Sequence, residues 1–227
     1  MYESELAGAG MRRPLWIAQP WLRAESLEAL AELNEQCLEL LCEQAAAVPA
    51  RSRPALLGEL EPLWRALDAA ARRRAAGCPF LLLDAGLARL APREWPAERC
   101  VRDWDWAAEP PPYFTVARTV SVTRLVLAYA WHLAQSEGAA ARLFLGISPA
   151  CAARLALCTL RQVIQLAEND PRLLTPRWPD RPTVWRDLLA AAAAGDAVGM
   201  EQFRMRGLQL LAAEARAREL ATGARAG

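Results

Sequence analysis

The side chains best suited to metal binding or nucleophilic chemistry are six cysteines and a single histidine. The cysteines are Cys37, Cys42, Cys78, Cys100, Cys151 and Cys158, and the histidine is His132. A structural zinc site usually takes its Cys and His ligands from closely spaced pairs. The nearest cysteines are five and seven positions apart, and His132 is distant from both pairs. We therefore expect no metal site, and we expect most of these cysteines to be small buried hydrophobic residues in a reducing compartment.

Catalytic chemistry lacks its usual components in this sequence. A Ser or Cys nucleophile needs a neighbouring base, and His132 lies beside Trp131 in an apolar helical run that favours a structural role. Every basic residue is Arg, so the lysine of a Schiff base and that of a phosphate-binding loop are both excluded. No Gly-x-Gly-x-x-Gly motif follows a predicted strand. We predict that the chain is not an enzyme and that it carries no cofactor.

The most informative spacing lies between Leu143 and Asp170. Two short helices, each capped by a hydroxyl residue, are joined there by Cys158 and Thr159, a spacing similar to a helix-turn-helix. The second helix would expose Arg and Gln, which bond bidentately to guanine and adenine edges. The candidate DNA-binding residues are Arg154, Arg161, Gln162 and Gln165. The alternative is a tight helical corner with solvated side chains, and the spacing alone favours it.

The elements that position these residues are predicted to be helices throughout. A hairpin of helices at about 27–47 and 62–76 is followed by a short apolar run, 78–83, that we expect to be buried as a strand or a helical turn. Ser26 is the expected cap of the first helix, and Asp196 that of the last. Later helices are predicted at about 115–135, 138–145, 149–157, 159–169 and 184–194. The expected fold is all-α, with an N-terminal helical hairpin region and a C-terminal multi-helix domain.

The domain boundary is placed in the tryptophan- and proline-rich segment 89–112. The predicted divisions are an N-terminal region at 1–112, a helical domain at 113–216 and a frayed tail at 217–227. The first ten residues are acidic and lack an apolar run, and the most apolar stretch, 116–134, is interrupted by Arg118 and Arg124. Neither pattern is typical of a signal peptide or a membrane span, so we expect a cytoplasmic protein with no membrane contact.

Charge gives no global attraction to nucleic acid, because 27 basic residues face 26 acidic ones for a net charge of +1. The exclusive use of Arg is typical of a GC-rich genome. It is also compatible with a local face that binds phosphate or guanine. Any DNA contact is therefore expected to be local.

Several stretches of the C-terminal part resemble the FlhD family, the subunit of the flagellar master regulator. They are Leu125-Val-Leu-Ala-Tyr-Ala, Leu145-Gly-Ile-Ser with Ala152 and Leu155, Thr159-Leu-Arg-Gln-Val, Leu166-Ala-Glu, Leu173-Leu, Arg177 and Asp180, and Gly207 with Leu208 and Leu210. The resemblance covers about residues 115–216. It implies a homodimeric transcription activator that joins a zinc-binding FlhC-like partner subunit and contacts DNA through the complex. Regulation of flagella would follow from it.

The resemblance also implies roles for particular residues. The last helix would bind the partner, with Phe203, Met205 and Arg206 as candidates. Members of the family can carry an intersubunit disulfide, for which Cys151 or Cys158 lies in the matching region. Met205 and Arg206 replace the histidine often found before the glycine of that helix, which implies a different partner. The alternative function is a helical adaptor or export chaperone whose N-terminal hairpin holds a client helix.

Overall fold

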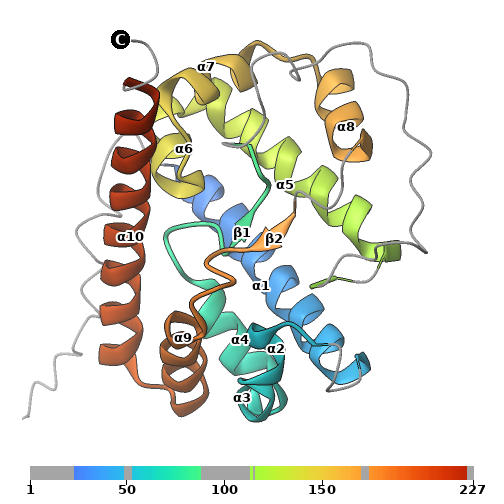
Figure 1. The fold of residues 1–227 in the computed structure, drawn as a ribbon, viewed down its shortest axis with the longest axis vertical. Coiled ribbons are helices and arrows are strands. Elements are labelled where there is room, and N and C mark those ends of the chain that lie inside the picture. Colours follow the sequence, from blue (N-terminus) through green and yellow to red (C-terminus); the bar gives the residue numbers. More distant parts are fainter. Residues whose placement is uncertain (1–22, 49–52, 88–112, 115, 170–173, 224–227) are drawn as a thin grey trace, which may run out of the picture.

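A computed structural model describes residues 23–48, 53–87, 113–114, 116–169 and 174–223 of the chain (Figure 1). Within these ranges the protein is almost wholly helical, which confirms the predicted all-α class. The first elements are α1 (Ala24–Ala47), α2 (Ala55–Gly58), α3 (Glu61–Ala66), α4 (Ala69–Ala76) and the strand β1 (Leu83–Asp84). They are followed by α5 (Val116–Ser136), α6 (Gly138–Leu145), α7 (Pro149–Leu157), α8 (Leu160–Asn169), β2 (Thr175–Pro176), α9 (Pro182–Ala194) and α10 (Ala197–Gly223).

The start of α1 differs from the prediction that Ser26 caps it. Arg23 is the N-cap residue and makes no side-chain cap. Ser26 is buried, and its hydroxyl donates to Oε1 of Glu137 at 2.6 Å. The helix begins at Ala24, so Ser26 lies inside its first turn and not at the N-cap, and its hydroxyl donates a charge-assisted bond across the fold. This bond joins the start of α1 to the junction between α5 and α6.

The second predicted helix of the hairpin is broken into α3 and α4. α3 ends at Ala66, and Oδ1 of Asp68 accepts the amide of Ala71 at 2.7 Å as the N-cap of α4. On α3 the indole of Trp64 is buried and donates to the carbonyl of Leu56 at 3.0 Å. The capping carboxylate therefore ends one helix and starts another where apolar periodicity alone predicts continuity.

The centre of the molecule is formed by two of the long helices, α1 and α5, which pack on each other, and by the short β1–β2 pair (Figure 1). The run 78–83 is buried, as predicted, and ends in β1. Asn34 of α1 is wholly buried and fixes this segment: its amide donates to the carbonyls of Ala76 and Phe80, and its oxygen accepts the amide of Leu82 at 2.8 Å. A buried amide group with these partners specifies one position for the segment.

Arg177 is a second buried polar residue at the centre. Its guanidinium donates to the carbonyls of Leu81, Leu83 and Leu145 at 2.7–3.1 Å. Burial lowers its pKa, and the charge of Asp84 opposes that shift. Arg177 therefore ties β1 to the end of α6, since three carbonyls would otherwise be buried without donors.

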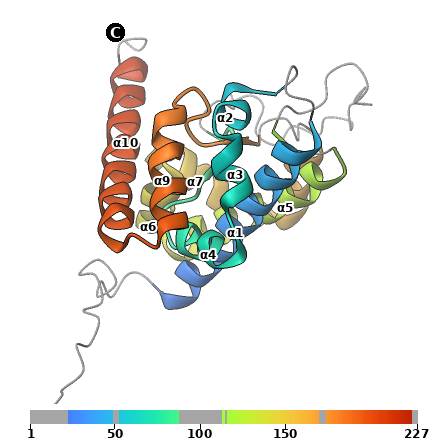
Figure 2. The ribbon, with the colours of Figure 1, turned by 90° about the horizontal axis from the view of Figure 1, so that it is seen from below.

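The C-terminal helices α9 and α10 lie side by side and cover one side of this centre (Figure 2). Phe80 contacts Trp178 and Phe203 with ring centroids 5.7 and 6.0 Å apart. α10 continues to Gly223, so the predicted fraying of the tail is wrong for residues 217–223. One hydrophobic core contains residues from both sides of the predicted domain boundary, which itself falls on residues outside the described part of the chain.

Candidate functional site

The candidate site is the α7–α8 corner, residues 149–169, whose helix bounds agree with the prediction. Oγ of Ser148 accepts the amide of Cys151 at 3.1 Å, and Pro149 occupies the first turn of α7. Thr159 and Gln162 form the predicted capping box of α8: Oε1 of Gln162 accepts the amide of Thr159 at 2.8 Å, and Oγ1 of Thr159 accepts the amide of Gln162 at 3.3 Å. Local sequence therefore determines both helix starts.

α5 holds the corner in place. The indole Nε1 of Trp131 donates to the carbonyl of Cys158 at 2.7 Å, and Nε2 of Gln135 donates to the carbonyl of Ala156 at 3.1 Å. These bonds satisfy carbonyls at the end of α7 that have no partner within the helix. The corner is thus fixed to a long central helix, which is the rigid support a recognition surface needs.

α8 buries one side on α5 and leaves the other uncovered within the described residues. Val163 and Ala167 are buried against the core, and Glu168 forms an ion pair with Arg124 of α5. Arg161 and Gln165 are exposed one helical turn apart. The helix therefore presents a bidentate donor and an amide on the same exposed side.

The four predicted DNA-binding residues have different surroundings. Arg154, Arg161 and Gln165 are exposed, Arg154 on the last part of α7 and the other two on α8. Gln162 is half-buried, and its side-chain oxygen is used in the capping box. Gln162 is therefore occupied with the start of the helix, while the other three side chains are available to a ligand.

The corner also presents apolar side chains that sequence analysis missed. Leu157, Leu160 and Ile164 have exposed fractions of 85, 50 and 38%. Leu160 and Ile164 lie four residues apart on α8, a spacing of one helical side that could have marked them, whereas Leu157 is the last residue of α7. The same spacing is typical of a core-facing stripe, so only the structure shows that nothing in the described chain covers them. The corner offers both polar and apolar contact groups.

The predicted partner-binding residues of α10 do not share one surface. Met205 is half-exposed, and Arg206 is exposed and forms an ion pair with Asp187 of α9 at 2.6 Å. Phe203 is buried against Phe80, which corrects its assignment as a partner contact. Apolar burial of a phenylalanine is strongly favoured over exposure, so this side chain stabilises the core.

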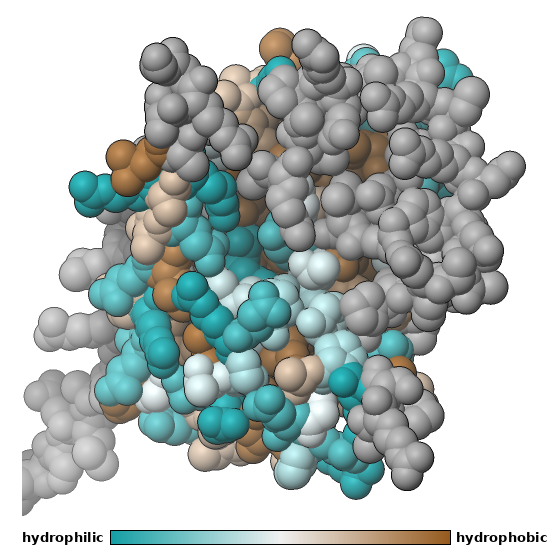
Figure 3. Space-filling view, viewed as in Figure 1, coloured by the Kyte–Doolittle hydropathy of each residue, from teal (hydrophilic) through white to brown (hydrophobic). Residues whose placement is uncertain are grey.

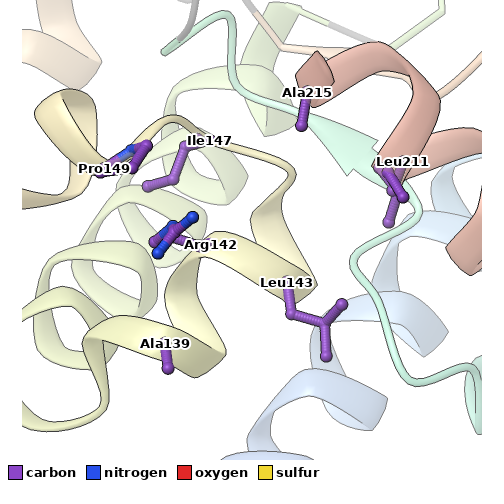
Figure 4. Close-up of a pocket in the computed structure, with 8 residues that line it drawn as sticks. Ala139, Arg142, Leu143, Ile147, Pro149, Leu211 and Ala215 are labelled. Atoms are coloured by element: carbon purple, nitrogen blue, oxygen red, sulfur yellow. The ribbon is translucent and has the colours of Figure 1, made fainter. Parts of the chain in front are cut away.

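Two hollows adjoin α10. One of 230 Å³ is lined by Ala139, Arg142, Leu143, Ile147, Pro149, Leu211, Ala212 and Ala215. Figure 4 shows the side chains of α6 facing those of α10 across it. The other, of 490 Å³, lies between α9 and α10 beside the Asp187–Arg206 ion pair. Neither is lined by a Ser, Thr or Cys nucleophile beside a histidine.

The described cysteines are free thiols with raised pKa values. Burial raises the pKa of Cys151 to about 11, although Arg154 and Arg218 lower it, and burial also raises the pKa of Cys158. Sγ of Cys151 contacts the carbonyl of Leu87, and Sγ of Cys158 contacts that of Arg154. Protonated and largely covered thiols react slowly, since the thiolate is the nucleophile. No group of His, Cys, Asp and Glu within the described residues is arranged to hold a metal ion.

On the face shown in Figure 3, hydrophilic residues predominate over α9, α2 and α3. No single helix in the described ranges is long and apolar enough to cross a membrane; α6 and α7 pass that test only as a pair bent by 119°.

No family model, curated protein or solved structure matches the chain. The geometry of the α7–α8 corner therefore has to support any assignment of function.

Proposed function

We propose that the chain is a subunit of a transcriptional regulator and that its α7–α8 corner contacts DNA. The observation that carries the proposal is the exposure of Arg161 and Gln165 on one side of a helix held firmly on α5, with Arg154 exposed nearby in sequence. The resemblance of residues 115–216 to the FlhD family supports the same function. Regulation of flagella and activation of promoters belong to this proposal.

α8 has dimensions suited to a major groove. Its 10 residues give a length of about 15 Å at the usual rise of a helix. Arg reads guanine and Gln reads adenine through two hydrogen bonds each, and every such pair contributes about 1–3 kcal/mol of discrimination. Two such contacts give a sequence preference but only part of the affinity of a typical regulator.

A partner subunit supplies the remaining affinity in this proposal. Binding to phosphates requires several basic residues on one surface, and the chain has a net charge of only +1. The family resemblance implies an FlhC-like subunit in this role. Leu157, Leu160 and Ile164, exposed on the same corner, are suitable contacts for such a protein.

Genome-wide occupancy of the tagged full-length protein in its own cell tests the proposal. Discrete peaks upstream of genes are expected, and purified protein together with its partner should bind these fragments less tightly as salt rises, through counterion release. A well-expressed protein with no peaks would contradict the assignment.

A helical adaptor or export chaperone is the second candidate. The observation that favours it is the exposed apolar set Leu157, Leu160 and Ile164, which could receive an amphipathic client helix. Cross-linking in cells followed by mass spectrometry separates the two functions. An adaptor should give one client protein and no DNA fragment, whereas a regulator should give specific DNA fragments together with its partner subunit.

A further inference from the structure

The order of elements occurs twice in the described chain. A long helix, three shorter helices and a two-residue strand make up α1–β1, and the same series makes up α5–β2. We refer to residues 24–84 as the first unit and to 116–176 as the second. The long helices have 24 and 21 residues, and the fourth helices have 8 and 10. Similar order and length in both halves indicate a repeated unit.

The helices of the two units pack in the same way. In the first unit, α1 contacts α2, α3 and α4, and α2 contacts α3. In the second unit, α5 contacts α6, α7 and α8, and α6 contacts α7. Each long helix is therefore the support of its own unit, with the fourth helix, α4 or α8, as its most extensive neighbour.

The long helices bury the same positions. From Leu30 onward α1 buries nine residues, and each has a buried counterpart 89 positions later in α5. The pairs are Leu30 and Thr119, Leu33 and Val122, Asn34 and Thr123, Cys37 and Val126, Leu38 and Leu127, Leu40 and Tyr129, Leu41 and Ala130, Gln44 and Leu133, and Ala45 and Ala134. Any amphipathic helix buries a stripe, but this agreement includes every buried position on both helices over that stretch.

The turn between the third and fourth helices also recurs. Asp68 caps α4 by accepting the amide three residues later, and Thr159 does the same for α8. Just before these caps, the amide of Leu67 donates to the carbonyl of Trp64, and the amide of Cys158 donates to that of Leu155. The four residues joined by these two bonds are buried: Trp64, Leu67, Leu155 and Cys158. The two corners therefore have the same local construction with different side chains.

The antiparallel register of the strand pair has the symmetry of a half-turn. Leu83 pairs with Pro176, and Asp84 pairs with Thr175, in antiparallel register. If Leu83 corresponds to Thr175 and Asp84 to Pro176, exchange of the units leaves this register unchanged. A self-complementary contact of that kind is the signature of a twofold dimer interface. In the sequence, Pro79-Phe-Leu-Leu precedes β1 by the same spacing as Pro171-Arg-Leu-Leu precedes β2.

We infer that this chain is an internal duplication, in which two copies of one helical unit pair about a pseudo-twofold axis as the subunits of a symmetric dimer would. The α1–α5 and β1–β2 contacts form the interface between the units. The surface that a second copy would use for this pairing is therefore occupied within one chain. The homodimer that the family resemblance implies is replaced by a single chain.

The two corners of this internal pair are not equivalent in their surroundings. α9 packs on α2, α3 and α4 of the first unit, where Trp185 contacts Trp64 with centroids 5.7 Å apart and Nε of Arg74 donates to the carbonyl of Ala192 at 2.8 Å. In the second unit the corner exposes Leu160 and Ile164, which follow the cap residue Thr159 by one and five positions. The residues that follow the matching cap, Asp68, by one and five positions are Ala69 and Arg73. Of the two corners, only that of the second unit leaves large apolar side chains uncovered by the described residues, and one chain should bind one partner there.

Solution mass tests the single-chain arrangement with the full-length protein. Two versions with different affinity tags are co-expressed, and the purified protein is examined by light scattering over a wide range of concentration. We expect the mass of one chain and no co-purification of the second tag. A stable two-chain particle containing both tags, with α1 of one copy packed on α5 of the other, would overturn the inference, because the pairing surface would then be available to another copy.

Superposition of the two units in a crystal structure of the full-length protein tests the duplication itself. A rotation close to a half-turn should place α1 on α5, α3 on α7, α4 on α8 and β1 on β2 together. A rotation far from a half-turn, or helices that fail to coincide, would overturn it even if the protein is a monomer. Neither measurement involves DNA, so the duplication and the regulatory function can fail independently.

Discussion

The ring of Phe80 lies directly against the backbone of Gly207, where α10 crosses the segment that leads into β1. A Cβ atom at residue 207 would lie 2.1 Å from Cζ of Phe80 and 2.4 Å from Cε1, well inside van der Waals contact. Phe80 is held in turn between Trp178 and Phe203. The glycine is therefore required by the close approach of a helix to an aromatic ring.

Gly207→Ala should destabilise the protein. Overpacking costs about 1–3 kcal/mol, whereas the higher helix propensity of Ala returns at most about 1 kcal/mol, so we expect a net loss in the free energy of unfolding. Urea denaturation measures it. Gly138→Ala is the control, because a Cβ at that position has no neighbour within 4 Å. Equal stability of the two variants would contradict the close approach.

Asn34→Leu should unfold at lower urea concentration than the parent protein. The change keeps the number and branching of the side-chain heavy atoms but leaves the carbonyls of Ala76 and Phe80 and the amide of Leu82 without their buried partner. A buried polar group left unpaired costs about 1–3 kcal/mol. The exposed Glu32 on the same helix provides the control, since Glu32→Ala should change stability by less than about 0.5 kcal/mol. Hydrogen exchange at Leu82 should accelerate only in Asn34→Leu.

Stability should fall at alkaline pH in reducing buffer. Burial raises the pKa of Cys37 above its ordinary value and that of Cys78 to about 12. Above about pH 8.5 the unfolded chain releases these protons while the folded chain keeps them, so the free energy of unfolding falls as pH rises. Each such thiol contributes up to about 1.4 kcal/mol per pH unit there.

The double variant Cys37→Ala, Cys78→Ala isolates this effect. Its stability is lower at neutral pH because two buried side chains are shortened, but its dependence on pH between about 8.5 and 10 should be weaker than that of the parent. Urea denaturation at several pH values provides both slopes. Identical slopes would show that these two thiols do not titrate as their burial requires.

Arg161→Ala with Gln165→Ala should weaken binding to the fragments found by genome occupancy by at least tenfold, since each bidentate base contact contributes about 1–3 kcal/mol. Circular dichroism should be unchanged because both side chains are exposed. Arg73→Ala is the matched control: it removes an exposed arginine from α4, the counterpart of α8. Unaltered affinity in the double variant would remove α8 as the DNA contact.

A parallel change separates DNA contact from partner contact on the same corner. Leu160→Ser with Ile164→Ser removes two exposed apolar side chains and should lower co-purification of the partner subunit while leaving the fold intact. If the client of an adaptor is lost and no DNA is ever recovered, the second candidate function takes precedence. Full retention of every bound protein would show that these leucine and isoleucine side chains are not contacts.

The sequence by itself determined the local structure wherever short-range signals act alone. Ser148 with Pro149 and Thr159 with Gln162 predicted the starts of α7 and α8 because a capping side chain bonds to amides only three residues away. Apolar periodicity and the scarcity of strand-forming residues determined the all-α class. Burial of the run 78–83 followed from its composition, since a continuous run of apolar side chains is strongly driven out of water.

Tertiary structure decided what depends on partners distant in sequence. Ser26 bonds to Glu137 and not to its own helix, and Arg177 donates to three carbonyls more than 30 residues away. The pairing of the two units and the exposure of Leu157, Leu160 and Ile164 depend on which elements cover which surfaces. A helical stripe has the same spacing whether it is covered or open, so only the positions of α5, α9 and α10 distinguish core from contact surface.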